Sequence, residues 1–147
     1  MKKILPVFII AILVSSLSFS ASAQCKGFAK KVCKLSLVPY IHDGNYDAAI
    51  LTEGEEAELY KTCYAGQQYR IVVCGSESVP QVEFKVIDAN RNVLFDNTKH
   101  KMVPSWDFKL EASQQLKIVV KVPVSAKKKA DSEIISGCVA IMFGFKE

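Results

Sequence analysis

The chemistry of this 147-residue chain is easiest to argue from its five cysteines, at positions 25, 33, 63, 74 and 138. Thiols form disulfides, bind metals or act as nucleophiles, and their spacing helps to decide between these uses. No Cys-x-x-Cys pair occurs, which argues against a thiol oxidoreductase. The two histidines, His42 and His100, have no cysteine or carboxylate at a zinc-ligand spacing, which argues against a zinc site. Disulfide formation is therefore the chemistry that the cysteines predict, provided that the chain leaves the reducing cytoplasm.

The first 23 residues predict that it does. A short basic region opens the chain, the apolar run Ile4–Leu17 follows, and Ala21–Ala23 is a small-x-small cleavage site of a Sec-type signal. Lipid attachment at Cys25 is the alternative, but Gln24 stands where bacterial lipoprotein signals have a small residue. Cleavage after Ala23 would leave residues 24–147 as a single domain, periplasmic or secreted, with no transmembrane segment.

Five cysteines in an exported protein predict two disulfides and one thiol left over. We expect the disulfides, with the pairing left open, among Cys25, Cys33, Cys74 and Cys138. If residues 24–35 are helical, about 12 Å separates Cys25 from Cys33 along the axis, and both must staple this segment to the rest of the domain. If the segment is irregular, the two can close a local loop instead. Cys63 is the candidate free thiol, because it lies opposite apolar Leu110 in the repeat described next and fits a small core residue.

A nine-residue stretch that occurs twice, 47 residues apart, organises the rest of the chain. Ala65–Val73 reads AGQQYRIVV and Ala112–Val120 reads ASQQLKIVV, each a polar turn that leads into a strand. In both copies the alternate positions are large and apolar, so that they can share one buried face. These positions are Tyr69, Ile71, Val73, Leu116, Ile118 and Val120. The recurrence predicts an internal duplication.

Short strands separated by turns account for the remaining sequence. Besides the repeat, strand-like runs cover residues 48–52, 57–64, 82–87, 93–95, 105–110 and 137–145. The last run is continuously apolar, which is typical of a central strand buried on both faces. Turn residues recur about every eight to twelve positions, and no long helical pattern is present. We therefore predict an all-β fold, a two-sheet antiparallel β-sandwich of the jelly-roll or Greek-key type, preceded by a short helical or irregular segment.

The most metal-like pattern of the chain lies in the loop HDGNYD. Asp43, Asn45 and Asp47 alternate as the first ligands of an EF-hand loop do. That motif needs glycine at its sixth place and glutamate at its twelfth, where this chain has Ala48 and Gly54. We interpret the loop as a turn whose side chains bind their own backbone, and we expect no metal or other cofactor.

No arrangement of residues typical of an enzyme occurs. The chain has no Gly-x-Ser-x-Gly elbow and no glycine-rich phosphate loop, and Glu53, Glu55 and Glu56 fit a solvated turn. Without Lys2 and Lys3 of the signal, seventeen basic residues face fifteen acidic ones, too small an excess to indicate a nucleic-acid partner. Tyr64 and Trp106 are the candidates for a binding patch, because exposed aromatic residues often mark partner sites.

Two stretches of the sequence share one pattern: an apolar strand, a turn of the Ala-Gly-Gln kind and a second strand. They are AELYKTCYAGQQYRIVV at 57–73 and WDFKLEASQQLKIVV at 106–120, and the hairpin VEFKVIDANRNVLFDN lies between them at 82–97. Over residues 55–145 this pattern distantly resembles the bacterial pre-peptidase C-terminal domain, a small exported β-sandwich. The resemblance implies an accessory role in secretion or binding, without catalysis.

Three further segments give a second resemblance. CKGFAKKVC at 25–33, PYIHDG at 39–44 and the closing GCVAIMFGF at 137–145 are similar to those of a group of short exported bacterial proteins of unknown function. This likeness implies no activity.

Together these observations predict an exported, non-catalytic β-sandwich that serves as a binding or interaction module of the cell envelope or the secreted fraction. Its partner would be a protein, a glycan or another envelope component. The alternative is a thiol-dependent role, in which an unpaired cysteine forms a mixed disulfide or a covalent dimer. An exposed thiol would favour the alternative, and a fully protected thiol would favour the binding module.

Overall fold

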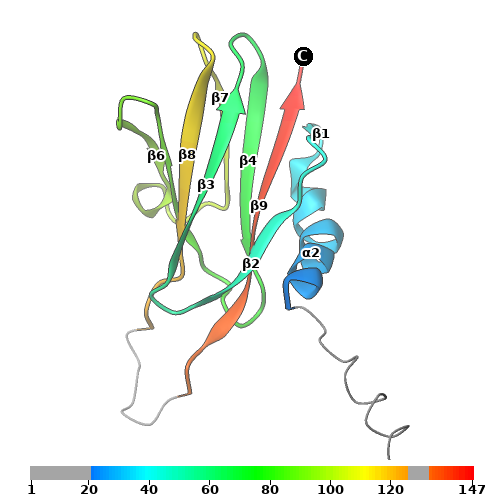
Figure 1. Ribbon diagram of the computed structural model, residues 1–147, viewed down its shortest axis with the longest axis vertical. Helices are drawn as coiled ribbons and strands as arrows, with labels where there is room; N and C mark the ends of the chain where they lie inside the picture. The colour runs from blue at the N-terminus through cyan, green and yellow to red at the C-terminus, as the bar shows by residue number, and fades with distance from the viewer. Residues whose placement is uncertain (1–20, 126–132) are drawn as a thin grey trace, which may run out of the picture.

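The computed structural model describes residues 21–125 and 133–147. Within them, two antiparallel sheets pack face to face, and one short helix lies outside the sandwich (Figure 1). The predicted all-β, two-sheet sandwich is confirmed. The predicted signal peptide lies, as far as residue 20, outside the described residues, and its cleavage site stays a prediction.

The two sheets have different strand orders. In the first sheet, β9 pairs on one side with two short strands and on the other side with β4, which pairs in turn with β7. Its strands are β1 (Ile41–His42), β2 (Asp47–Thr52), β9 (Ser136–Lys146), β4 (Gln68–Gly75) and β7 (Ser105–Lys109). The second sheet has the order β3 (Glu56–Cys63), β8 (Gln114–Lys121), β5 (Glu83–Ile87), β6 (Val93–Asp96), and the short 3-10 helix η2 (Asn97–Lys99) follows β6.

The internal duplication takes the form of two strand–turn–strand units that cross between the sheets in opposite directions. β3 and β4 form the first unit, β7 and β8 the second, and β3 pairs with β8 while β4 pairs with β7. The two turns also touch, since the Gly66 N–H donates to the Leu110 carbonyl at 3.1 Å and the Ala65 N–H donates to Ser113 Oγ at 2.8 Å. This exchange of partners brings all six alternating apolar side chains of the repeat into one buried core.

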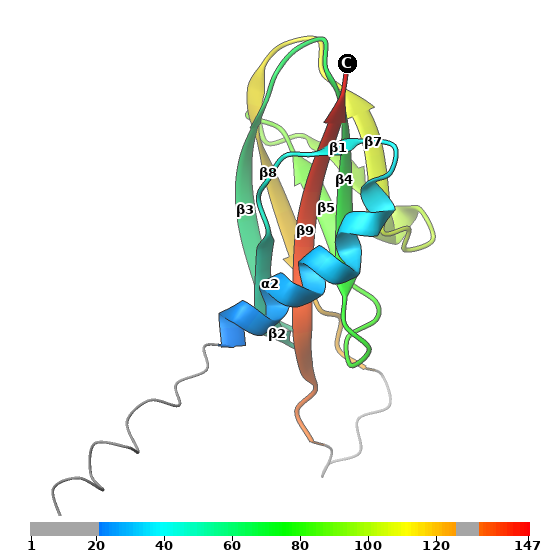
Figure 2. The same ribbon diagram turned by 90° about the vertical axis from the view of Figure 1, so that its right-hand side faces the viewer.

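β9 is the central strand that its apolar sequence predicts. Its inward residues Val139, Ile141 and Phe143 lie in the core between the sheets. Its outward residues Ala140 and Met142 are also buried, beneath the helix α2 (Ala21–Lys31) and the 3-10 helix η1 (Cys33–Leu37). Figure 2 shows this helical segment lying across the outer face of the first sheet. Both faces of β9 are therefore covered, which explains the absence of the usual alternation of apolar and polar residues.

The segment after the predicted cleavage site is helical, so Cys25 and Cys33 do not bond to each other. Cys25 is instead joined to Cys138 of β9 by a disulfide, with 5.2 Å between the two Cα atoms. Lys30 and Lys31 lie in the last turn, where positive charge stabilises the helix dipole. No helix within the described residues is long and apolar enough to span a membrane.

Aromatic rings close the side of the sandwich where β7 faces β6. Trp106 stacks on Phe108 with 4.6 Å between ring centroids and on Phe95 with 5.2 Å, and Phe95 stacks on His100 with 4.9 Å. We refer to this side as the closed edge. Its large rings fill the gap that two twisted sheets leave where they diverge.

A buried asparagine fixes the closed edge to the backbone. The Asn97 amide has no solvent exposure. Its oxygen accepts the Phe84 N–H at 2.8 Å, and its nitrogen donates to the carbonyls of Val82 at 2.9 Å and Val103 at 3.3 Å. The side chain thus satisfies backbone groups at the start of β5, where β6 does not pair, and one carbonyl in the segment before β7.

Candidate functional site

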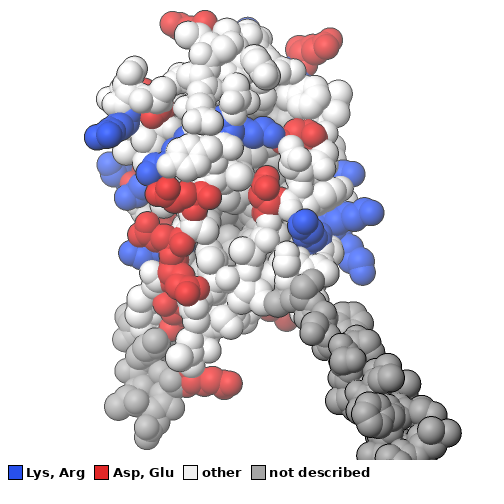
Figure 3. Space-filling model, viewed as in Figure 1, with Lys and Arg blue, Asp and Glu red and all other residues white. Residues whose placement is uncertain are grey.

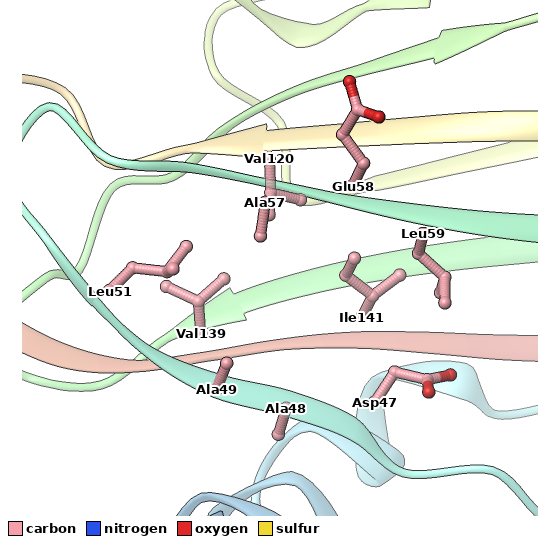
Figure 4. A pocket seen from close by; sticks show the side chains of 10 residues that line it. All are labelled: Asp47, Ala48, Ala49, Leu51, Ala57, Glu58, Leu59, Val120, Val139 and Ile141. Atoms are coloured by element: carbon pink, nitrogen blue, oxygen red, sulfur yellow. The ribbon is translucent and has the colours of Figure 1, made fainter.

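The opposite side of the sandwich, where the edge strands β2 and β3 face each other, contains an apolar groove of about 210 Å³. We refer to this side as the open edge. Figure 4 shows Leu51, Leu59, Val139 and Ile141 pointing into the space between β3 and β9. The residues that line the groove are Asp47, Ala48, Ala49, Leu51, Ala57, Glu58, Leu59, Val120, Val139 and Ile141.

Small side chains explain why a groove remains here. The two walls of the groove carry Ala49 of β2 and Ala57 of β3, and each of these side chains is a single methyl group. Aromatic rings fill the corresponding gap at the closed edge. At the open edge the groove therefore reaches residues of the core between the sheets, such as Leu51, Val139 and Ile141. Apolar concave surface of this kind is the usual form of a binding site.

Acidic side chains surround the groove. Figure 3 shows them gathered over β3, with the surface hollowed beside them. Glu58 accepts a hydrogen bond from Lys117 at 3.0 Å, and Glu56 lies 3.9 Å from Lys121, so β8 already supplies lysines to these two carboxylates. Asp47 is different, because its half-buried carboxylate forms no hydrogen bond or ion pair with any described residue.

Burial, followed by the negative charge of Asp43, raises the pKa of Asp47, and the positive charges of Lys61 and Lys26 offset this rise only in part. The carboxylate is thus held where its charge is disfavoured, at one lip of an apolar groove. A cationic group placed directly beside the carboxylate would offset that cost. The groove and Asp47 together can accept an apolar side chain with a basic group next to it.

An ion pair between Asp43 and Lys61 lies next to the groove and joins the two sheets across the open edge. Lys61 is an inward-pointing residue of β3, and its side chain is 24% exposed against 12% for Asp43. Asp43 also accepts the Asn45 N–H at 2.9 Å, so the HDGNYD loop is the self-bonded turn that its sequence predicts. Within the described residues, no three His, Cys, Asp or Glu side chains converge as a metal site.

The pKa of Asp43 reflects opposing influences. Burial is the largest single influence and raises the pKa. Hydrogen bonds from Lys61 and Asn45 and the charge of Lys61 together lower the pKa by more than burial raises it, so the pKa of Asp43 lies below its ordinary value. Asp43 is consequently ionised at neutral pH and keeps Lys61 in place. An inward-pointing charge on an edge strand also disfavours pairing with a strand of another molecule.

A second hollow, of about 350 Å³, continues the open edge beyond this ion pair. We refer to it as the tyrosine cleft, and its lining residues are Asp43, Lys61, Thr62, Tyr64, Gln67, Tyr69 and Phe145. Tyr64, one of the two aromatic candidates, lies here with 61% of its surface exposed. The hydroxyl of Tyr69 accepts the Tyr64 N–H at 2.9 Å and donates to Gln67 Oε1 at 2.8 Å, which fixes the wall of the cleft.

The other aromatic candidate is placed elsewhere. Trp106 is half-buried, packs against the core and belongs to the closed edge, so it shares no surface with Tyr64. It stays a prediction that either aromatic contacts a partner.

The cysteines without a disulfide are Cys33, Cys63 and Cys74. Cys63 is fully buried in the core, and burial is the main reason that its pKa is raised to about 11. Cys33, also fully buried, belongs to a cluster against which the half-buried Cys74 packs. Interaction with the Cys74 side chain, together with burial, raises the pKa of Cys33, and the same interaction lowers the pKa of Cys74. Cys63 is therefore poorly suited to thiol exchange.

Comparisons with known proteins identify the fold and leave the activity open. No protein-family model matches the chain, and no curated protein matches it. The fold is similar to the solved structure of Aeromonas hydrophila PliG, a periplasmic lysozyme inhibitor of g-type lysozyme. The TM-score is 0.52 and the sequence identity 13%, over 74% of this chain and 89% of PliG. A designed double-stranded β-helix gives a TM-score of 0.33 and 16% identity, over 69% of this chain and 99% of the design. At this level of identity, the likeness to PliG supports the sandwich fold alone.

The sequence predicted the self-bonded turn and singled out Tyr64 as a candidate contact residue, but it did not reveal the groove. Its walls come from three separate segments, around Asp47, Ala57 and Val139, and none carries a recognisable motif. The one signal in the sequence is alanine at strand positions where large side chains are usual, as at Ala49 and Ala57.

Proposed function

We propose that this protein is an exported, non-catalytic binding module that holds a protein partner at its open edge. The partner inserts an aliphatic side chain into the apolar groove, and a lysine or arginine beside it pairs with Asp47. Tyr64 and the tyrosine cleft extend the contact surface along the same side of the sandwich.

The observation that carries the proposal is a half-buried carboxylate without an ion-pair partner among the described residues, at the lip of an apolar groove. A groove alone fits many occupants, and a carboxylate alone fits many roles. Their combination favours a basic, amphipathic protein segment over a neutral glycan, since a glycan offers no positive charge to Asp47. The Cys25–Cys138 disulfide supports export, because such bonds persist in oxidising compartments.

The fold likeness suggests a class of partner. PliG is an inhibitor of g-type lysozyme, which is a glycan hydrolase. We propose, as the finer form of the function, that the partner of this chain is also a hydrolase that acts on cell-wall glycans. A g-type lysozyme is the first purified probe to use.

The test compares three variants in a binding assay with purified g-type lysozyme, and with proteins captured from the exported fraction of the cells that produce the chain. Ala49→Phe fills the groove, and Asp47→Asn removes the charge at its lip. Ala89→Phe makes the same change as the first variant at an exposed turn of the second sheet that lines neither the groove nor the tyrosine cleft, and serves as the matched control. Circular dichroism and thermal unfolding show first that each variant is folded.

We expect Ala49→Phe to weaken binding at least tenfold, and Asp47→Asn to weaken it about fivefold or more with a smaller salt dependence. Ala89→Phe should bind as the wild type does. Equal binding by all four proteins would overturn the assignment of the groove. Groove-dependent binding of captured proteins that are not hydrolases of cell-wall glycans would support the assignment of the groove and contradict the finer proposal.

The thiol-dependent alternative receives less support. Cys63, the cysteine proposed for it, has no exposed surface. A partner could form a mixed disulfide with Cys63 only after the core had opened.

A further inference from the structure

Four cysteines lie on two facing surfaces, two on each. Cys25 and Cys33 belong to the helical segment and are both fully buried against the first sheet. On the sheet, Cys74 of β4 lies directly opposite Ala140 of β9, and Cys138 is two residues before Ala140. Residues that are opposite in a ladder, or two apart in a strand, project from the same face. Cys74 and Cys138 therefore both point toward the helical segment.

One cysteine of each surface is already bonded across this interface, as Cys25–Cys138. The other two meet in the same way. Cys33 opens η1 and belongs to the buried cluster over β4 and β9, and Cys74 packs against that cluster. The two side chains are close enough for each to shift the pKa of the other. Two cysteines whose side chains interact across one packed interface can reach bonding distance by side-chain rotation.

We propose that Cys33 and Cys74 form a second disulfide in the exported protein, and that the two bonds together clamp the helical segment to the first sheet at two points. Eight residues separate Cys25 from Cys33, which is about 12 Å along a helix. One bond leaves the segment free to pivot, whereas two bonds fix both its position and its direction. Cys63 stays a thiol in the core between the sheets.

Bond formation requires an oxidant, which we take to be a disulfide-bearing thiol oxidase or a small oxidised dithiol of the exported compartment. Half-exposed Cys74, as its thiolate, attacks one sulfur of the oxidant disulfide and forms a mixed disulfide, while the first oxidant thiolate leaves. Cys33 then loses its proton and attacks the Cys74 sulfur, and the second oxidant thiolate leaves. The protein gives up two protons and two electrons, and the oxidant becomes a dithiol.

Trypsin offers a direct test, because each of the five cysteines falls in a different tryptic peptide. Cys33 lies in residues 32–34, Cys63 in 62–70, Cys74 in 71–85 and Cys138 in 130–146. The full chain is collected from the exported fraction, alkylated under denaturing conditions without reduction, digested, and analysed by mass spectrometry. We expect peptide 32–34 linked to 71–85, the Cys25 peptide linked to 130–146, and peptide 62–70 alkylated.

Three results would overturn the proposal. The first is alkylation of both Cys33 and Cys74, and the second is a link from either one to Cys63. The third is an adduct of another thiol on Cys74, which would instead favour the thiol-dependent role.

Limited proteolysis supplies a second measurement on variants. Cys33→Ser frees Cys74, so we expect Cys74 to become alkylatable in the native protein, and tryptic cleavage at Lys34 to proceed at least tenfold faster than in the wild type. Cys63→Ala, the matched control, should leave both properties unchanged. If Cys33→Ser and Cys63→Ala behave alike, the clamp does not exist.

Discussion

Replacing Lys61 by methionine should test how the open edge is held together. Methionine keeps the length and the apolar stem of lysine but removes the ammonium group that pairs with Asp43. The ammonium also lies 5.3 Å from the centroid of the Phe143 ring, so the substitution removes a cation–π contact as well. Asp43 then remains as a largely buried carboxylate at the junction of the two sheets.

The structure sets the size of the effect. Breaking a fully buried ion pair costs about 3 to 5 kcal/mol, because one charge is left without its partner. Here the Lys61 side chain is 24% exposed, and Asp43 still accepts hydrogen bonds from the Asn45 N–H at 2.9 Å and from the Asn45 side chain at 3.3 Å. We therefore expect a loss of about 2 kcal/mol in the free energy of unfolding, or roughly 6 to 10 °C in melting temperature for a domain of this size.

Urea unfolding of Lys61→Met, Asp43→Asn and the double variant measures the coupling directly. Asp43→Asn in the Lys61→Met background should recover part of the lost stability, because it removes the unpaired charge. Lys117→Met is the matched control, since Lys117 forms a comparable pair with Glu58 at 3.0 Å on the exposed face of the second sheet. We expect no measurable change there. If Lys61→Met unfolds at the same urea concentration as Lys117→Met, the open edge is not held by this ion pair.

Three further predictions concern the pH dependence of this ion pair, the buried asparagine and the disulfide. The folded-state pKa of Asp43 lies below its ordinary value, so ionised Asp43 stabilises the fold above about pH 4, and this stabilisation is lost as the pH falls through the folded pKa. Lys61→Met should therefore lose less stability than the wild type on acidification, and an equal loss would contradict the assignment. Asn97→Ala leaves a buried N–H and buried carbonyls unpaired and should cost about 2 to 3 kcal/mol in urea unfolding, whereas a cost below roughly 0.5 kcal/mol would mean that water replaces the amide. Cys25→Ser with Cys138→Ser removes a cross-link between residues 113 positions apart and should cost about 4 kcal/mol in urea unfolding, and a variant as stable as the oxidised wild type would contradict this assignment. The fully reduced wild type should unfold at a still lower urea concentration, because reduction also opens the proposed Cys33–Cys74 bond.

Most of the architecture could be predicted from the sequence, because it rests on local patterns. The recurrence of AGQQYRIVV as ASQQLKIVV predicted two equivalent units, and the observed pairing of β3 with β8 and β4 with β7 is the arrangement in which both copies bury the same positions. The continuous apolar run at the C-terminus predicted a strand covered on both faces, which β9 is.

The candidate site could not be predicted, because it depends on distances between segments that are remote in sequence. Asp47 becomes notable only when β3 and β9 place an apolar groove beside it and leave it without an ion pair among the described residues. Alternation along β7 placed Trp106 on one face but could not show that Phe95 and Phe108 would stack on it. The cysteine pairing was open for the same reason, since it depends on where the helical segment crosses the first sheet.

Site-specific photo-crosslinking at position 64 tests the central claim most directly, since it captures a partner of any identity. A benzophenone amino acid replaces Tyr64, an exposed aromatic residue of the tyrosine cleft at the open edge, or Ala89, at the exposed turn of the second sheet, and the exporting cells are irradiated. We expect a discrete protein adduct from position 64 that is absent from position 89 and whose yield falls when Asp47→Asn is added. Adducts of equal yield from both positions, or none from position 64, would contradict a binding module that acts through its open edge.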